Sequence, residues 1–160
     1  MASEKIRIRE YKKGDYLYTK RLMQQLTASV GREFEEDRWK KHISIRLSSG
    51  LGGMLIAADE DDHCFGMAFV EVRTKPTGQY YQHHPRTDKY GYITNVVVDE
   101  KWRGKGIGEK LIRKAIEELK NAGIEIIRIN VRENATEAKN LYRKIGFKES
   151  YTVMEYEVKD

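Results

Sequence analysis

Short segments of alternating apolar and polar residues predict strands, and longer segments with apolar residues three or four positions apart predict helices. Isoleucine and arginine alternate over residues 6–9, a pattern typical of a half-buried strand. After Asp15, a residue type that often precedes a helix, apolar side chains recur at every fourth position. These positions are Tyr18, Leu22, Leu26 and Val30. The same spacing of Trp39, Ile43 and Leu47 indicates a second helix.

The rest of the chain alternates between predicted strands and helices. Strands are predicted at residues 54–58, 64–72, 92–98, 124–131 and 147–158, and a helix at residues 105–121. A short helix is expected between Asn134, which would cap it with Glu137 three residues later, and Gly146, which would end it. Residues 74–89 lack a sustained period and form a long loop, and long loops are often functional. This order predicts one mixed α/β domain.

Length, cysteine usage and the N-terminus narrow the class of protein. A chain of 160 residues can bury one sizeable core, and no apolar run approaches the ~18 residues of a membrane span. The N-terminus has no apolar signal core, so we expect a cytoplasmic protein that does not bind membranes. Cys64 is the only cysteine, which excludes an internal disulfide and a cysteine-based zinc site. The adjacent His83 and His84 point poorly at one metal ion, and no metal is expected.

The basic residues indicate an anionic ligand without identifying it. A formal net charge of +5 could attract nucleic acid, a membrane surface or a small polyanionic cofactor. These residues are spread along the chain rather than gathered in a tail, which favours the small ligand. No recognised nucleic-acid motif is present, so no nucleic-acid partner is expected.

The turn Arg103-Gly104-Lys105-Gly106-Ile107-Gly108 joins a valine-rich strand to a helix. The first turn of a helix has N–H groups without a partner and partial positive charge, so it can bind a phosphate. Alternating glycines keep side chains away from that backbone, and two basic side chains add charge. Glycine costs roughly 1 kcal/mol relative to alanine within a helix, so three of them require a reason. A connection that merely tolerates glycine is the structural alternative.

Two other phosphate motifs do not fit this turn. A dinucleotide fingerprint that starts at Gly104 requires glycine at position 109, where the chain has Glu109. A Walker loop requires Gly-Lys-Ser/Thr, which is absent from the sequence.

Two motifs together resemble a known family. The pattern Arg103-x-x-Gly106-x-Gly108 after Val-Val-Val-Asp is similar to the acetyl-CoA signature of the GNAT superfamily of N-acetyltransferases. Residues 134–147, with Asn134, Ala138, Leu141 and Tyr142, resemble its second cofactor motif. The resemblance implies a single domain over residues 1–160 with a central, twisted, mostly antiparallel sheet of six to seven strands and about four helices. It also implies acetyl-CoA as co-substrate.

The resemblance assigns roles to individual residues. Backbone groups of Val96 and Val98 would contact the pantetheine arm, and an N–H near Val97 would polarise the thioester carbonyl. Asn134, Ala138 and Tyr142 share one helix face that can meet the cofactor. Tyr142 would be the general acid that protonates departing coenzyme A, because a phenol with pKa ~10 stays protonated at neutral pH. The structural alternatives are sheet core for the valines, a helix cap for Asn134 and packing for Tyr142.

The general base and the acceptor are less defined by the sequence. Glu71 lies at the end of the predicted strand 64–72, which precedes the strand 92–98 that leads into the glycine turn, and it is the best available carboxylate for the base. His83 or His84 could serve instead. Cys64 is expected to be a small core residue. The predicted function is acetyl transfer from acetyl-CoA to a primary amine of a small molecule or a protein. A catalytically silent acyl-CoA-binding regulatory module is the alternative, and a homodimer is left open.

Overall fold

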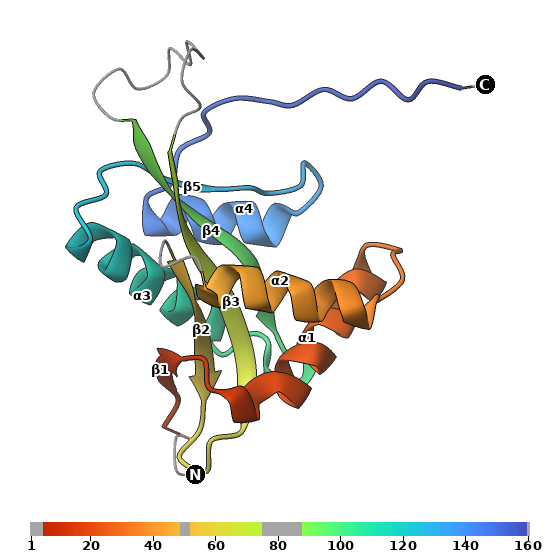
Figure 1. Ribbon diagram of the computed structural model, residues 1–160. Helices are drawn as coiled ribbons and strands as arrows, with labels where there is room; N and C mark the ends of the chain where they lie inside the picture. Colours follow the sequence, from red (N-terminus) through yellow and green to blue (C-terminus); the bar gives the residue numbers. More distant parts are fainter. Residues whose placement is uncertain (1–4, 49–51, 75–87, 160) are drawn as a thin grey trace. The chain divides into compact units, whose positions relative to one another are not determined.

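The computed structural model describes residues 5–48, 52–74 and 88–159, and the chain divides into two compact units, Met1–Asn130 and Val131–Asp160. The described residues of the first unit contain one five-stranded sheet with the strands in chain order (Figure 1). The strands are β1 (Arg7–Glu10), β2 (Gly52–Ala58), β3 (Cys64–Thr74), β4 (Lys89–Val98) and β5 (Ile127–Ile129). Neighbouring strands are antiparallel except β4 and β5, which are parallel.

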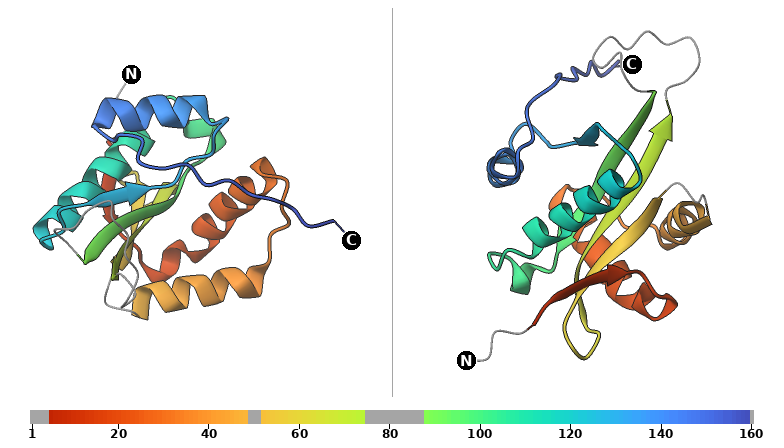
Figure 2. Two further views of the ribbon diagram at one scale, coloured as in Figure 1. Left: turned by 90° about the horizontal axis from the view of Figure 1, so that it is seen from above. Right: turned by 90° about the vertical axis from the view of Figure 1, so that its left-hand side faces the viewer.

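Helices cover both faces of this sheet. In the first unit they are α1 (Tyr16–Ser29), α2 (Glu36–Ser48) and α3 (Ile107–Asn121), with 3₁₀ turns η1 (Lys13–Asp15) and η2 (Glu100–Trp102). Figure 2 shows α1 and α2 on one face and α3 on the other. The second unit contains α4 (Thr136–Ile145). Among the described residues, no helix has both the length and the apolar character needed to cross a lipid bilayer.

The alternation of side chains along the central strands builds the core on each face. On one face, Trp39 of α2 packs edge-on against Phe69 of β3, with ring centroids 5.7 Å apart. On the other face, α3 lies so close to β4 that a Cβ at Gly91 would be 2.8 Å from a methyl group of Leu119. Glycine at position 91 therefore permits the close packing of α3, the helix that follows the glycine turn.

Asp15 differs from its predicted role. It precedes α1 as expected, but its side chain makes no capping bond with that helix. The carboxylate is buried and accepts hydrogen bonds from two guanidinium nitrogens of Arg9 at 2.7 and 2.9 Å and from the Lys12 N–H at 2.7 Å. These bonds join β1 to the start of α1. Burial by itself would raise the pKa of Asp15, but the hydrogen bonds from Arg9 and Lys12 and the charge of Arg9 outweigh it and leave the pKa below its usual value.

The predicted strand at residues 147–158 is wrong. The described residues from 147 to 159 form no strand, and Met154, Tyr156 and Val158 are 90%, 89% and 81% exposed. Alternation favours an extended backbone, but a strand also requires a neighbouring strand for its hydrogen bonds, and the described residues of the second unit contain none. The predicted strand at residues 124–131 is likewise shortened to β5. The sheet of six to seven strands is therefore corrected to five among the described residues, whereas the single domain over residues 1–160 stays a prediction.

Candidate functional site

The ladder between β4 and β5 ends well before β4 does. It runs only from the pair Gly91 and Ile127 to the pair Ile93 and Ile129, whereas β4 continues to Val98. In the described part of the first unit, the edge of β4 after Ile93 that faces away from β3 therefore has no neighbouring strand. Backbone N–H and C=O groups along such an edge are available to a ligand.

A β-bulge interrupts β4 along this open edge. Met67 of β3 pairs with Val97, but Phe69, two residues later, pairs with Thr94, so β4 has one extra residue between these pairs. Asn95 lies in this bulge with φ of 49°, in the left-handed region that asparagine tolerates better than most residues. A bulge locally bends the strand and changes the direction of its backbone groups. The sequence analysis missed this feature, and the one local signal for it is an asparagine within a valine-rich strand.

The direction of the backbone groups after the bulge follows from two hydrogen bonds. The Asp99 N–H donates to the Phe65 carbonyl at 2.8 Å and so faces β3. Successive residues of a strand alternate, so the backbone of Val98 faces the open edge, where its carbonyl accepts a bond from Arg103 Nε at 3.2 Å. The backbone of Val97 then faces β3 and that of Val96 faces the open edge. Of the three predicted valines, Val96 and Val98 thus have backbone groups on this edge.

The glycine turn leads from β4 into α3. Asp99 begins it by accepting the Lys101 N–H at 3.0 Å, which fixes the short turn η2. Gly104 and Gly106 both have φ of 77°, and a Cβ on either would meet no other atom within 4 Å. Glycine is therefore required by the left-handed backbone conformation, since there is ample space for a side chain.

The first turn of α3 keeps its N–H groups available. Gly106 is the N-cap of the helix and has no side chain to cap it, and the first helical hydrogen bond is from the Lys110 N–H to the Gly106 carbonyl at 3.1 Å. The N–H groups of Ile107 and Gly108 come before that bond in the first turn of the helix, where N–H groups have no partner within the helix. Ile107 is buried, so its side chain anchors the helix start in the core. Such a turn can bind a phosphate.

An aromatic stack supports the glycine turn from one side. The ring of Trp102 stacks on Phe65 of β3 with centroids 3.8 Å apart and an interplanar angle of 23°. The ammonium group of Lys105 lies 4.2 Å from the Trp102 centroid, within the range of a cation–π interaction. The two basic residues of the turn, Arg103 and Lys105, are both exposed. Arg103 bonds to the Val98 carbonyl, and Lys105 lies over the Trp102 ring. Sequence analysis did not single out this stack, because Phe65 and Trp102 are far apart in the chain.

Glu71 lies in a cluster of guanidinium groups. Its carboxylate forms an ion pair with Arg46 of α2 and accepts a hydrogen bond from Arg73 Nε at 2.7 Å. Arg46 also reaches the hydroxyl of Thr94, the residue that precedes the bulge, at 3.4 Å. Glu71 is therefore neutralised by two cations and is connected through Arg46 to the bulged part of β4. Only the fold could reveal this, because α2 supplies Arg46 from a distant part of the sequence.

The remaining predicted residues belong to the second unit. Tyr142 lies on α4 one turn after Ala138, and its ring is 6.0 Å from that of Phe147. Burial raises the pKa of Tyr142, which keeps the phenol protonated. The predicted cap at Asn134 is wrong: Ala135 is the N-cap of α4, no side chain caps the helix, and the Asn134 carbonyl accepts the Thr136 N–H at 3.0 Å. His83 and His84 lie outside the described residues.

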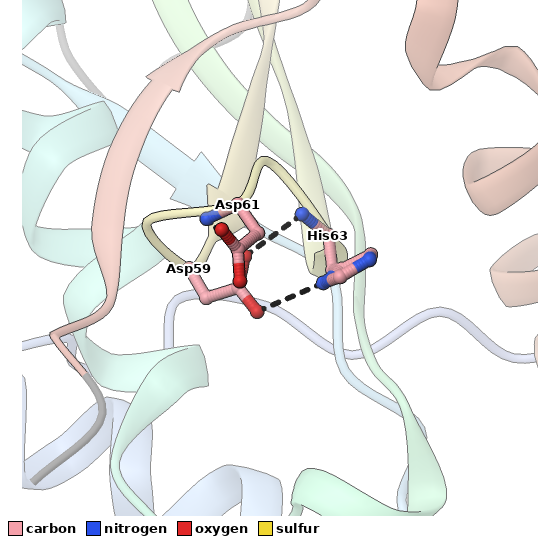
Figure 3. A group of neighbouring side chains, drawn as sticks. All are labelled: Asp59, Asp61 and His63. Atoms are coloured by element: carbon pink, nitrogen blue, oxygen red, sulfur yellow. Dashed lines mark hydrogen bonds and ion pairs between the residues drawn. The ribbon is translucent and has the colours of Figure 1, made fainter. Parts of the chain in front are cut away.

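A further group of ligating side chains lies in the turn between β2 and β3, at Asp59, Asp61 and His63 (Figure 3). One oxygen of the Asp59 carboxylate accepts the N–H groups of Asp61 and His63, both at 2.9 Å. The other oxygen lies 3.1 Å from His63 Nδ1. These bonds within the turn account for the convergence of the three side chains. The prediction of no metal rested on the single cysteine and on His83 and His84, and not on this group.

Comparison with known proteins identifies the family. The sequence profile of the acetyltransferase (GNAT) family matches residues 18–147, so the chain belongs to the GNAT acetyltransferase family. An N-alpha-acetyltransferase of Sulfurisphaera tokodaii is 37% identical over 75 residues, which cover 45% of this chain and 44% of that protein. An uncharacterized N-acetyltransferase of Bacillus subtilis, YobR, is 45% identical over 60 residues, which cover 38% of this chain and 24% of that protein. The chain thus spans less than half the length of these relatives.

Solved structures show the same fold. The aminoglycoside N-acetyltransferase AAC(6')-Iy in complex with CoA superposes with a TM-score of 0.80 at 17% identity, covering 98% of this chain and 96% of that one. A transcriptional regulator from Bacillus halodurans superposes with a TM-score of 0.79 at 21% identity, covering 96% of this chain and all of that one (100%). These structures show the fold, and the match to the family profile confirms the family resemblance inferred from the glycine turn and the Tyr142 segment.

Proposed function

We propose that this protein transfers the acetyl group of acetyl-CoA to a primary amine. The observation that carries the proposal is the direct connection between the open edge of β4 and the glycine turn. Val96 and Val98 present backbone groups along the edge, and the first turn of α3, where the N–H groups of Ile107 and Gly108 precede the first helical bond, begins nine positions after Val98. A ligand with an extended polar arm and a phosphate group matches both features. CoA, with its pantetheine arm and pyrophosphate, is such a ligand, and it is the ligand named for AAC(6')-Iy.

The residues of the turn fit a pyrophosphate. The left-handed conformations of Gly104 and Gly106 leave open space over the backbone, so phosphate oxygens can approach the N–H groups of Ile107 and Gly108. Arg103 and Lys105 are exposed on the same turn and supply positive charge. The helix dipole of α3 adds to this attraction.

The bulge in β4 suits the reacting end of the ligand. Acetyl-CoA supplies the acetyl group as a thioester, in which a C–S bond breaks as a C–N bond to the amine forms. Negative charge develops on the carbonyl oxygen during this attack, and a preorganised N–H donor can stabilise it. The prediction was an N–H near Val97, and the alternation of the strand favours that of Val96, which faces the open edge beside Asn95.

Two proton transfers complete the reaction. The amine gives up one proton and the departing sulfur takes one. We assign protonation of the departing sulfur to Tyr142, whose pKa is raised by burial. We assign contacts with the cofactor to Asn134 and Ala138. Glu71 remains the predicted base that takes the proton from the amine, and both of its oxygens form ion pairs, one with Arg46 and one with Arg73.

The test is a CoA-release assay with acetyl-CoA and a panel of amines, together with thermal unfolding in the presence of acetyl-CoA, ATP or NAD. We expect release of CoA with a subset of the amines, an acetylated product by mass spectrometry, and stabilisation by acetyl-CoA alone. Equal stabilisation by all three nucleotides would contradict the cofactor assignment. Stabilisation by acetyl-CoA without acetylation of any amine would support the alternative, a silent acyl-CoA-binding module. A cytoplasmic location and a homodimer stay predictions.

A further inference from the structure

Arginine side chains gather on one face of the sheet, close to the bulge of β4. Arg46 of α2 and Arg73 of β3 both hold Glu71, and the guanidinium of Arg73 lies 4.0 Å from the centroid of the Tyr92 ring. Arg128 of β5 donates to the hydroxyl of the same tyrosine at 3.1 Å. Strand register explains the gathering, because Glu71, Tyr92 and Arg128 are successive cross-strand partners and cross-strand partners share a face.

This cluster carries an excess of positive charge. Arg46 and Arg73 hold the carboxylate of Glu71, and Arg128 bonds to Tyr92 on the same face, so these four side chains sum to a net charge of +2. Burial and the neighbouring Arg73 both lower the pKa of Arg46, which means that the cluster disfavours further positive charge. A cationic ligand would be repelled here, and an anionic group would relieve the repulsion.

The cluster lies at a defined distance from the proposed site of acetyl transfer. Arg46 contacts Thr94, which directly precedes the bulge, whereas Arg73 lies over Tyr92. Tyr92 comes before Val96 by four positions, or about 13 Å along a strand at ~3.3 Å per residue. Arg73 is the more accessible of the two arginines, with its side chain 47% exposed against 17% for Arg46. An acceptor whose amine reaches the bulge could place a second group against Arg73, at a separation of up to about 13 Å along the strand.

Resting on the proposed acetyl transfer, we propose that the acceptor is an amine that also carries an anionic group, a carboxylate or a phosphate, bound by Arg73. Arg73 donates to the anion from guanidinium N–H groups other than the Nε–H that Glu71 accepts. Arg46 is a positioning residue, because it holds Glu71 and thereby Arg73 in place. Polycationic amines are poor acceptors for the same electrostatic reason.

The test compares acceptors that differ only in the group at one end. ω-Amino acids with chains of three to eight carbons are compared with the amino alcohols, diamines and aminoalkyl phosphates of the same length. We expect kcat/KM for the anionic acceptors to exceed that for the matched alcohol and diamine by at least ~10-fold, as a single charged contact can provide. The carboxylate and phosphate series distinguish the two anions. The preference should be greatest for the longer chains, because these span the distance between the bulge and Arg73.

Variants assign the preference to Arg73. Arg73→Gln should lower the ratio of kcat/KM between anionic and neutral acceptors by at least ~5-fold, and Arg73→Glu should reverse it in favour of diamines. Arg113→Gln is the matched control, because Arg113 is similarly exposed at 54% and is ion-paired with Glu109 on α3. It should keep the wild-type ratio. Thermal unfolding of each variant verifies that it folds.

The outcomes separate this inference from the proposed function. Equal acetylation of the matched acceptors, or a preference for diamines in the wild-type protein, would overturn the anionic acceptor and leave acetyl transfer intact. If no amine is acetylated, acetyl transfer fails, and calorimetric titration of the CoA-saturated protein with the same compounds still decides the inference. Binding of the anionic compounds that is lost in Arg73→Glu supports it, whereas binding that is independent of Arg73 overturns it.

Discussion

Replacing Gly106 by alanine tests whether binding of CoA depends on access to the backbone at the N-terminus of α3 or on the stability of that helix. Gly106 has φ of 77°, and an added Cβ would meet no other atom within 4 Å, so the substitution brings conformational strain without a steric clash inside the protein. An L-residue in this conformation costs about 1–2 kcal/mol. For a chain of this length we expect Tm to fall by about 2–8 °C, at about 2–4 °C for each kcal/mol.

The same substitution should also weaken binding of CoA. The new methyl group would occupy the open space through which phosphate oxygens reach the N–H groups that follow Gly106. We expect Kd for CoA to rise at least ~10-fold, which corresponds to ~1.4 kcal/mol. The measurements are thermal unfolding without ligand and calorimetric titration with CoA.

The other end of α3 provides the control. Gly123 follows the helix with φ of 79° and also has no atom within 4 Å of an added Cβ. Gly123→Ala should therefore lower Tm by a similar amount and leave Kd unchanged. A wild-type Kd in Gly106→Ala would remove the phosphate from this turn. An equal loss of affinity in both variants would show that binding depends on the stability of α3 and not on access to the backbone.

Four further predictions concern single residues. Tyr142→Phe should lower kcat by ~10²-fold or more with little change in Kd for CoA, whereas Tyr156→Phe, at an exposed position, should not; an unaltered kcat would remove Tyr142 from the mechanism. If Glu71 is the base, activity of Glu71→Gln should be low at neutral pH and recover at high pH, and a wild-type pH profile would assign Glu71 to the ion pairs alone. Burial raises the pKa of Cys64 to about 12, so a thiol reagent at pH 8 should modify it only after unfolding, and fast modification of the native protein would contradict its burial. Hydrogen bonds from Arg7 and Arg9 lower the pKa of Asp62 from 3.8 to about 2, so the stabilisation that is fully present above pH 3.8 is lost as the pH falls through 2. Calorimetry should show a lower Tm for Asp62→Asn at pH 7 and a much smaller difference at pH 2, and equal losses at both would contradict the linkage.

The sequence predicted best what depends on neighbouring residues. The strand at 92–98, the glycine turn and the helix that follows it were located correctly, because alternation, glycine and the apolar stripe of α3 are all local signals. Burial of Leu22 and Trp39 was likewise predicted from helical spacing.

Features that depend on pairing between distant segments were missed or wrong. The bulge at Asn95 exists because β3 and β4 differ by one residue between two paired positions, and no local pattern records that difference. The ion pair of Glu71 with Arg46 requires α2 to pack beside β3. The alternation of residues 147–158 was a correct sign of an extended backbone but contains no information about a partner strand.

The open edge of β4 also has a consequence for the protein before it binds a ligand. Among the described residues β4 has no neighbouring strand on this edge after Ile93, and an edge of this kind can pair with a strand of another molecule as well as with a cofactor, which promotes association between chains. A cofactor lying along this edge would cover it. We therefore expect the ligand-free protein to aggregate faster on mild heating than the protein saturated with acetyl-CoA, beyond the difference that their melting temperatures explain. The supply of acetyl-CoA in the cell would then affect the solubility of this protein as well as its turnover of substrate.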